Sequence, residues 1–200
     1  MILDAEYWQN RYQNHTDNWD IGEVSAPLKA YFDQITDKNI KILVAGGGDS
    51  HETSYLYNSG FKNVFLLDWA NNALDKFLIK NPDFPENQTI CGDFFELDED
   101  FNHTFDLIIE QTFFCAISQK KRPEYAKKMH QLLKPNGKLV GVLFDDFAER
   151  TEPPFGGTQN EYKPYFEPYF DFKYFEKCYN SIAPRANREL FILLQKLNFG

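Results

Sequence analysis

Cysteine is scarce in this chain of 200 residues, and the three that occur are Cys91, Cys115 and Cys178. They are scattered and form no Cys-x-x-Cys pair, and the sequence shows neither a Ser/His/Asp array nor a metal-ligand array at a convincing spacing. An odd cysteine count favours a reduced protein over a disulfide framework. We therefore expect no metal, and we assign no certain catalytic residue.

Basic blocks and long apolar runs are also missing. The formal net charge is −9, whereas nucleic acids and anionic membranes attract clusters of Lys and Arg. No run approaches the ~20 apolar residues of a membrane span, and residues 1–6 lack the basic and apolar regions of a secretory signal. We expect a cytoplasmic protein without a nucleic-acid or membrane partner.

The length and the 42% hydrophobic content fit one globular domain with a sizeable core, and no internal repeat divides the chain. We expect a single domain over residues 1–200. Residues 1–36 would form an N-terminal helical segment that could cover a ligand as a lid, and residues 37–200 would form the α/β core.

Short apolar runs alternate with helical patterns along most of that core. The expected strands cover residues 40–44, 61–68, 88–91, 105–110, 138–144, 172–178 and 190–195. The alternation predicts parallel strands with right-handed crossovers, and the last two strands, with no helix between them, predict a hairpin. The expected fold is α/β: a Rossmann-like, open, mostly parallel seven-stranded sheet with helices on both faces and a C-terminal antiparallel hairpin.

A glycine-rich turn follows the first strand, at Gly46 to Gly48, and a helical pattern opens directly after it. This is the form of a nucleotide-like cofactor site, because glycine lets a ligand approach the bare backbone beside a helix N-terminus. His51 stands where the dinucleotide fingerprint has its third glycine, which disfavours a nicotinamide cofactor. His51 itself could cap the helix or pack near the turn, with a role as ligand or base as the alternative.

Acidic residues follow the second and third strands. Asp68 ends the second strand, about twenty residues after the glycines, where a carboxylate can accept hydrogen bonds from both ribose hydroxyls. This placement favours a cofactor site over a plain βα turn. Asp93 and Phe94 follow the third strand and could bind an adenine, although Asp93 could equally be a turn or helix-cap residue.

Aromatic residues give candidates for the reacting end of the site. Gln111 and Phe113 follow the fourth strand, and the ligand crevice of an open α/β sheet lies beyond the carboxyl ends of its strands. Phe113, Phe114 and Phe155 could form an apolar acceptor pocket, with a core role as the alternative. Near the N-terminus, Trp8 and Trp19 could be core residues or could attract a sulfonium cation.

Arginines in the loop of the expected hairpin are further candidates. Arg185 and Arg188 could steer an anionic acceptor, and solvated surface arginines are the alternative. Cys115 is expected to be a buried, small apolar residue and not a nucleophile.

In order along the chain, these features resemble the class I S-adenosylmethionine-dependent methyltransferases, and more closely the thiopurine S-methyltransferase-like family in its thiol and halide branch. The resemblance covers nearly the whole chain. Its markers are Tyr7, Trp8, residues 19–22, residues 46–52, Asp68, residues 92–94, residues 105–117, Arg122, residues 132–137 and residues 153–155.

The resemblance implies S-adenosyl-L-methionine as the cofactor, with the aromatic residues beside its methionine and sulfonium, Asp68 on its ribose, and Gln111 facing its methionine end. The implied cofactor-binding residues are Trp8, Tyr12, Trp19, Gly46, Gly48, Asp68, Asp93, Phe94 and Gln111, and the implied substrate pocket comprises Phe113, Phe114, Phe155 and Arg185. Thiopurine enzymes resemble this pattern but carry an arginine where Gln111 stands, which disfavours thiopurine itself.

The expected reaction is in-line displacement at the cofactor methyl group by a small soft nucleophile: a thiol, a halide or a related chalcogen species. Such a reaction depends on alignment and on a dry pocket. The alternatives are a cofactor-binding module without transferase activity and a nicotinamide reductase. We expect a small-molecule methyl acceptor as partner, and a monomer or weak homodimer.

Overall fold

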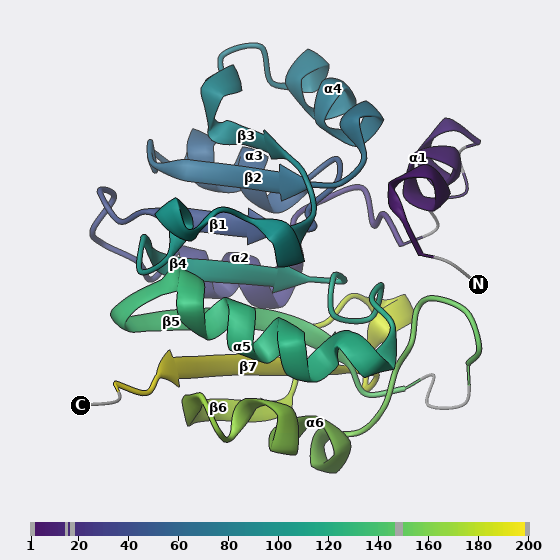
Figure 1. The fold of residues 1–200 in the computed structure, drawn as a ribbon, viewed down its shortest axis with the longest axis vertical. Helices are drawn as coiled ribbons and strands as arrows, with labels where there is room; N and C mark the ends of the chain where they lie inside the picture. The colour runs from purple at the N-terminus through teal and green to yellow at the C-terminus, as the bar shows by residue number, and fades with distance from the viewer. Residues whose placement is uncertain (1–2, 15, 17–18, 147–149, 199–200) are drawn as a thin grey trace.

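One twisted sheet of seven strands forms the centre of the computed structural model, which describes residues 3–14, 16, 19–146 and 150–198 (Figure 1). The strand order is β3-β2-β1-β4-β5-β7-β6. The strands are β1 (Ile42–Ala45), β2 (Val64–Asp68), β3 (Thr89–Cys91), β4 (Phe105–Gln111), β5 (Leu133–Phe144), β6 (Phe170–Lys177) and β7 (Glu189–Lys196).

The first five strands are parallel, and β7 pairs antiparallel with both β5 and β6. The predicted fold class is therefore confirmed, including the terminal hairpin. The hairpin folds back so that its second strand, β7, lies inside the sheet and β6 forms the edge. Strand β5 begins at Leu133, five positions before its predicted start at Lys138, because its first residue already pairs with Phe105 across a bulge.

Helices cover both faces of the sheet (Figure 1). They are α1 (Ala5–Gln13), α2 (Ala26–Phe32), α3 (His51–Asn58), α4 (Asn71–Lys80), α5 (Arg122–Leu132) and α6 (Gln159–Phe166). Short 3-10 turns occur at Glu86–Gln88, Phe94–Glu96, Glu99–Phe101, Gln119–Lys121 and Ala183–Arg185. Among the described residues, no helix combines the length and apolar character that crossing a membrane requires.

Two hydrophobic clusters fill the space between the helices and the sheet. On one face, Ile42 and Val44 of β1 pack with residues of α2, α3 and α4. On the other face, Leu43 and Ala45 pack with residues of α5 and α6. Successive side chains of a strand point to opposite faces, so a strand with helices on both sides is apolar throughout. This explains the uninterrupted apolar run of β1.

The start of α3 corrects one prediction. Ser50 is the N-cap, and its side chain accepts a hydrogen bond from the Thr53 backbone N–H at 3.1 Å. His51 is the first helical residue, so the cap role predicted for it belongs to Ser50. The side chain of His51 is thereby directed elsewhere, to the segment that precedes α2.

Helix α1 stands apart from the two helical layers, beside the carboxyl ends of the parallel strands (Figure 1). It contacts α4. The glycine turn after β1, the acid that ends β2 and the segment after β4 all lie at these carboxyl ends of the strands. The fold therefore brings several of the predicted site residues, from distant parts of the sequence, to the same end of the strands.

Candidate functional site

A cavity of about 410 Å³ opens at the carboxyl ends of the parallel strands. Gly46 and Asp68 contribute to its wall from the ends of β1 and β2, and Phe113 contributes from the segment after β4. Residues of α1, Trp19, the chain from the end of β5 to the loop before α6, and the loop between β6 and β7 also line it. The crevice beyond the carboxyl ends of an open α/β sheet is the usual ligand position for this architecture.

The glycine turn brings bare backbone against an aromatic ring. Gly46 has φ +60°, and a Cβ atom there would lie 2.4 Å from Cδ2 of Phe113. Gly48 has φ +57°, and a Cβ atom there would lie 2.1 Å from the hydroxyl oxygen of Tyr12. Both positions thus need glycine for the backbone conformation and for the close approach of a side chain. A larger residue would displace the side chains that form the wall.

Asp68 joins this turn to the second strand. One carboxylate oxygen accepts a hydrogen bond from the Gly48 N–H at 2.8 Å, and the other accepts one from the Ala70 N–H at 2.8 Å. Burial raises the pKa of Asp68 to about 6, against the effect of these backbone donors, and the side chain still lines the cavity. The Trp69 N–H also acts on this carboxylate, and because each carboxylate oxygen has two acceptor positions, at least one position remains for a ligand.

A smaller recess of about 50 Å³ adjoins the same wall. Gln111 lines it, and its Oε1 atom is buried without a hydrogen-bond partner in the described part of the chain. Buried polar atoms are nearly always paired, so this carbonyl marks a place where a ligand donor would fit. The acidic residues Asp20, Glu23, Asp49 and Glu52 also line the recess.

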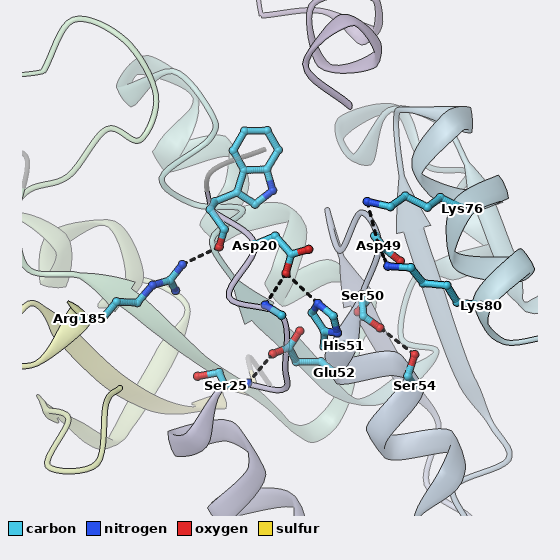
Figure 2. A network of polar contacts seen from close by, with 12 residues as sticks. Asp20, Ser25, Asp49, Ser50, His51, Glu52, Ser54, Lys76, Lys80 and Arg185 are labelled. Atoms are coloured by element: carbon cyan, nitrogen blue, oxygen red, sulfur yellow. Dashed lines mark hydrogen bonds and ion pairs between the residues drawn. The ribbon is translucent and has the colours of Figure 1, made fainter. Parts of the chain in front are cut away.

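Two lysines anchor the loop between the glycine turn and α3. Asp49, whose side chain is only 7% exposed, forms ion pairs with Lys80 and, at 3.1 Å, with Lys76, both from α4. Figure 2 shows both lysines reaching back to this carboxylate. The backbone of the turn is thus held from the α4 side as well as through Asp68.

Three polar contacts hold residues 19–25 against α3 and the loop before β7, at the carboxyl ends of the parallel strands (Figure 2). Arg185 Nη2 donates to the Trp19 carbonyl at 2.7 Å, His51 Nε2 lies 2.7 Å from Asp20 Oδ1, and the Ser25 N–H donates to Glu52 at 2.9 Å. Burial acts against ionisation of Asp20, but the Gly22 N–H and His51 hold its pKa below the ordinary value. The segment that carries Trp19 is therefore fastened at three points.

The N-terminal aromatic residues lie at the cavity. Trp8, Tyr12 and Trp19 all line it, and the ring of Trp19 makes edge contacts with the other two at centroid distances of 5.7 Å. Of the two roles considered for Trp8 and Trp19, the structure places both residues at the cavity wall. Arg11 lies over the Trp19 ring, with its guanidinium carbon 5.1 Å from the centroid.

Arginines are concentrated at this cavity. The chain has five arginines, and Arg11, Arg150, Arg185 and Arg188 line the wall. Arg185 is only 8% exposed and also pairs with Glu189 at 3.2 Å, so the interpretation of it as a solvated surface residue is wrong. Arg188 pairs with Asp146 at 2.5 Å. Four of the five arginines of an acidic protein thus lie at one cavity, two of them paired with acids.

Other predicted residues lie away from this wall as the structure describes it. Phe114 is buried in the core, where its ring packs on Tyr125 and Tyr162. Phe94 is buried with its ring 5.2 Å from that of Phe113, and Asp93 accepts a hydrogen bond from the Phe95 N–H as the cap of a 3-10 turn.

Phe155, predicted for the acceptor pocket, is not among the residues that line the cavity, and its polar contacts are made by its backbone. Its N–H donates to the Cys115 carbonyl at 2.7 Å, and its own carbonyl accepts from Arg122 Nη2 at 2.7 Å. These bonds join the segment after β4 to the loop at residues 153–157. Cys115 is buried, as predicted, and it also contributes to the cavity wall.

Sequence reasoning missed several lining residues. Trp69 directly follows Asp68 and could have been found from its place after the second strand. Arg11, Arg150, Pro153 and Pro154 also line the cavity. Their place at the cavity depends on how separate segments pack together, and no local sequence pattern signals that packing. Among the described residues, no group of three or more His, Cys, Asp or Glu side chains could hold a metal ion.

Comparison with known proteins finds a protein family whose model matches nearly the whole chain. The model described as thiopurine S-methyltransferase (TPMT) matches residues 3–196. The chain is 28% identical over 197 residues to thiocyanate methyltransferase 1 of Brassica oleracea, a match that covers 96% of this chain and 85% of that relative. It is 24% identical over 182 residues to the thiopurine S-methyltransferase of Vibrio cholerae, a match that covers 82% of each protein.

Solved structures share the fold. The 1,6-didemethyltoxoflavin-N1-methyltransferase of Burkholderia thailandensis, solved with 1,6-didemethyltoxoflavin and S-adenosylhomocysteine, has a TM-score of 0.77 at 16% identity, covering 97% of this chain and 87% of that one. TehB from Haemophilus influenzae has a TM-score of 0.68 at 18% identity, covering 96% and 67%. At these identities the likeness shows the fold alone.

Proposed function

Because the chain belongs to the thiopurine S-methyltransferase family, we propose that it transfers a methyl group from S-adenosyl-L-methionine to a small soft nucleophile. A thiol, a halide or a related chalcogen species would be the acceptor. The observation that carries this proposal is the single cavity in which the Gly46 backbone, the Asp68 carboxylate and an arginine-rich, apolar wall meet. Membership of the family agrees with the resemblance found in the sequence.

The residues at the ends of β1 and β2 fit the cofactor. Asp68 keeps acceptor capacity beyond its backbone donors and would accept from the ribose hydroxyls, and the bare backbone at Gly46 would lie beside the aminoacyl part. The unpaired Gln111 carbonyl in the acidic recess would accept from the cofactor ammonium group. Bound there, S-adenosyl-L-methionine supplies an electrophilic methyl group on a sulfonium sulfur.

Aromatic residues would stabilise the positive charge of the sulfonium. The faces of Trp and Tyr rings attract cations, and Trp8, Tyr12 and Trp19 stand together at the wall. We propose that residues 1–36 act as a cover over the cofactor. The three contacts that fasten residues 19–25 support this proposal, because they tie the cover to both α3 and the loop before β7.

The cavity wall also suits an anionic acceptor. Pro153, Pro154 and Pro184 give it apolar surface, and Arg185 and Arg188 supply positive charge. A thiolate or halide is already a nucleophile, so the residues need to align it and exclude water and need not remove a proton. An anionic acceptor of this kind would explain why the cavity wall combines arginine with proline.

A binding experiment followed by a transfer experiment tests the proposal. We expect calorimetry to show binding of S-adenosyl-L-methionine and not of NADH, and Asp68→Ala to weaken that binding by about 1–3 kcal/mol through the lost buried acceptor. Labelled methyl should then pass to at least one member of a panel of thiols, thiocyanate, iodide, selenite and tellurite. Binding of NADH would contradict the cofactor assignment, and binding without any product would identify a binding module.

A further inference from the structure

Glu110 is a fully buried acid at the carboxyl end of β4, and the site as described so far does not use it. Its Oε1 atom accepts hydrogen bonds from the backbone N–H of Phe113 at 2.8 Å and of Phe114 at 3.0 Å. Its Oε2 atom accepts one from the Tyr125 hydroxyl of α5. One carboxylate therefore fixes the segment after β4 to the helix that follows it.

That segment forms one wall of the cavity. Thr112, Phe113, Cys115 and Ala116 all line it, and Phe113 is the residue that lies against Gly46. Thr112 has φ +62°, a left-handed conformation that costs a non-glycine residue energy and persists only when its surroundings enforce it. The two N–H groups held by Glu110 come directly after this strained residue.

The sheet makes space for the acid. Glu110 lies opposite Gly141 of β5, where an added Cβ atom would stand 2.4 Å from the Glu110 Cβ. Burying a carboxyl group is costly, and apolar replacements of buried charged groups are often neutral or stabilising. An apolar residue would therefore satisfy the packing at this position, but it would leave the N–H groups of Phe113 and Phe114 without an acceptor.

We propose that Glu110 is the positioning residue of the acceptor wall: its carboxylate holds residues 112–116 in the register that places Phe113 on Gly46 and Cys115 at the cavity. The identification of this wall with the acceptor rests on the proposed function. Glu110 acts through the backbone that it holds and does not itself line the cavity as the structure describes it.

Cys115 gives a direct readout of this register. Its side chain is 6% exposed in relative terms, and its Sγ atom donates to the Thr112 carbonyl at 3.0 Å. Burial, and secondarily the charge of Glu110, raise the pKa of the Cys115 thiol well above its ordinary value, so we expect it to react slowly with alkylating reagents. Cys178, which is 8% exposed and belongs to the cluster on the opposite face of the sheet, is a matched control in the same chain.

The test compares Glu110→Leu with Glu110→Gln in the full chain, using iodoacetamide and peptide mass mapping to follow each cysteine. Loss of the acceptor in Glu110→Leu should raise the alkylation rate of Cys115 by about tenfold and leave Cys178 unchanged. Glu110→Gln keeps an oxygen for the two N–H groups and should stay near the wild-type rate. In transfer assays, Glu110→Leu should raise the KM of the acceptor more than the Kd of the cofactor.

Two results would overturn the proposal: an unchanged Cys115 rate in Glu110→Leu, or an equal rise at Cys115 and Cys178, which indicates general destabilisation. Should Glu110→Leu fail to fold, Tyr125→Phe keeps the ring and removes only the hydroxyl donor, and should raise Cys115 alkylation by about threefold with Cys178 unchanged. The alkylation measurement needs neither cofactor nor acceptor, so it stays decisive even where no methyl transfer is found.

Discussion

At the scale of single residues, Asp68 combines two tasks that usually fall to different groups. Its carboxylate fixes the glycine turn through the Gly48 N–H, and it faces the cavity with acceptor positions to spare. Burial raises its pKa to about 6, because the charged form loses solvation. The protonation of this one group therefore links the shape of the turn, ligand binding and stability to pH.

Cofactor affinity should consequently fall as the pH drops through about 6, since ribose hydroxyls donate to the ionised carboxylate. Below that pH the loss should approach about tenfold per pH unit. Stability should respond in the opposite direction. A carboxyl group whose folded-state pKa is raised contributes stability below its ordinary pKa of 3.8, and that contribution is lost as the pH rises through about 6.

Calorimetric titration of S-adenosyl-L-methionine between pH 5 and pH 8, roughly one unit below to two units above the Asp68 pKa, checks this dependence. Asp68→Asn is the control, because it cannot ionise. We expect its affinity to be weaker by about 1.5–3 kcal/mol and much flatter across the range. A wild-type profile as flat as that of Asp68→Asn would contradict the assignment of the ribose to Asp68.

At the scale of elements, the turn between β1 and α3 and the segment after β4 form one packed unit. A Cβ atom at Gly46 would meet the stem of Phe113, including its Cβ at 2.9 Å, whereas one at Gly48 would meet the hydroxyl end of Tyr12. The atoms of Phe113 close to its backbone cannot move away, whereas the hydroxyl end of Tyr12 can. The two glycines share a left-handed conformation and differ in what they touch.

Gly46→Ala should therefore destabilise the protein more than Gly48→Ala. Both changes carry the left-handed strain of about 1–2 kcal/mol, and only the first adds a clash that shifts Phe113, for a total of about 3 kcal/mol. Urea unfolding of both variants measures the difference. Phe113→Ala in the Gly46→Ala background should recover part of the loss. Equal losses in the two single variants would show that the contact with Phe113 is unimportant.

The same elements show what a sequence can reveal. The glycines after β1 and the acid ending β2 could be placed because their positions follow from the ends of strands. Phe113 and Phe114 could not be separated, because strand alternation stops at Gln111 and the left-handed Thr112 then redirects the chain. One phenylalanine enters the cavity wall and the other enters the core. The burial of Arg185 depends on contacts with Trp19 and Glu189, which sequence spacing does not encode.

At the scale of the whole molecule, segments from the N-terminal and C-terminal parts of the chain meet at one site. Arg185 reaches the Trp19 carbonyl across 166 positions of sequence, and all three tryptophans, Trp8, Trp19 and Trp69, line the same cavity. Residues 19–25, the start of α3 and the loop before β7 are thus joined directly (Figure 2). No tryptophan lies elsewhere in this sequence.

Intrinsic tryptophan fluorescence should therefore report cofactor binding without a label. We expect saturable quenching or a spectral shift on adding S-adenosyl-L-methionine, with the same Kd as calorimetry, because each emitting ring lies at the ligand wall. Trp19→Phe should reduce the amplitude, and NADH serves as the control ligand. Heat of binding without any change in emission would place the cofactor away from these residues.

The contact between Phe113 and Gly46 has a consequence for redesign. The ring of Phe113 would separate the methyl donor from the acceptor. Replacing Phe113 with a smaller residue to enlarge the acceptor side would therefore also loosen the binding site of the donor. Pro153, Pro154 and Pro184 line the same cavity, and none of them is among the three atoms nearest to a Cβ built at Gly46 or Gly48. Substitution of those prolines offers a way to broaden the range of acceptors while leaving the binding site of the donor intact.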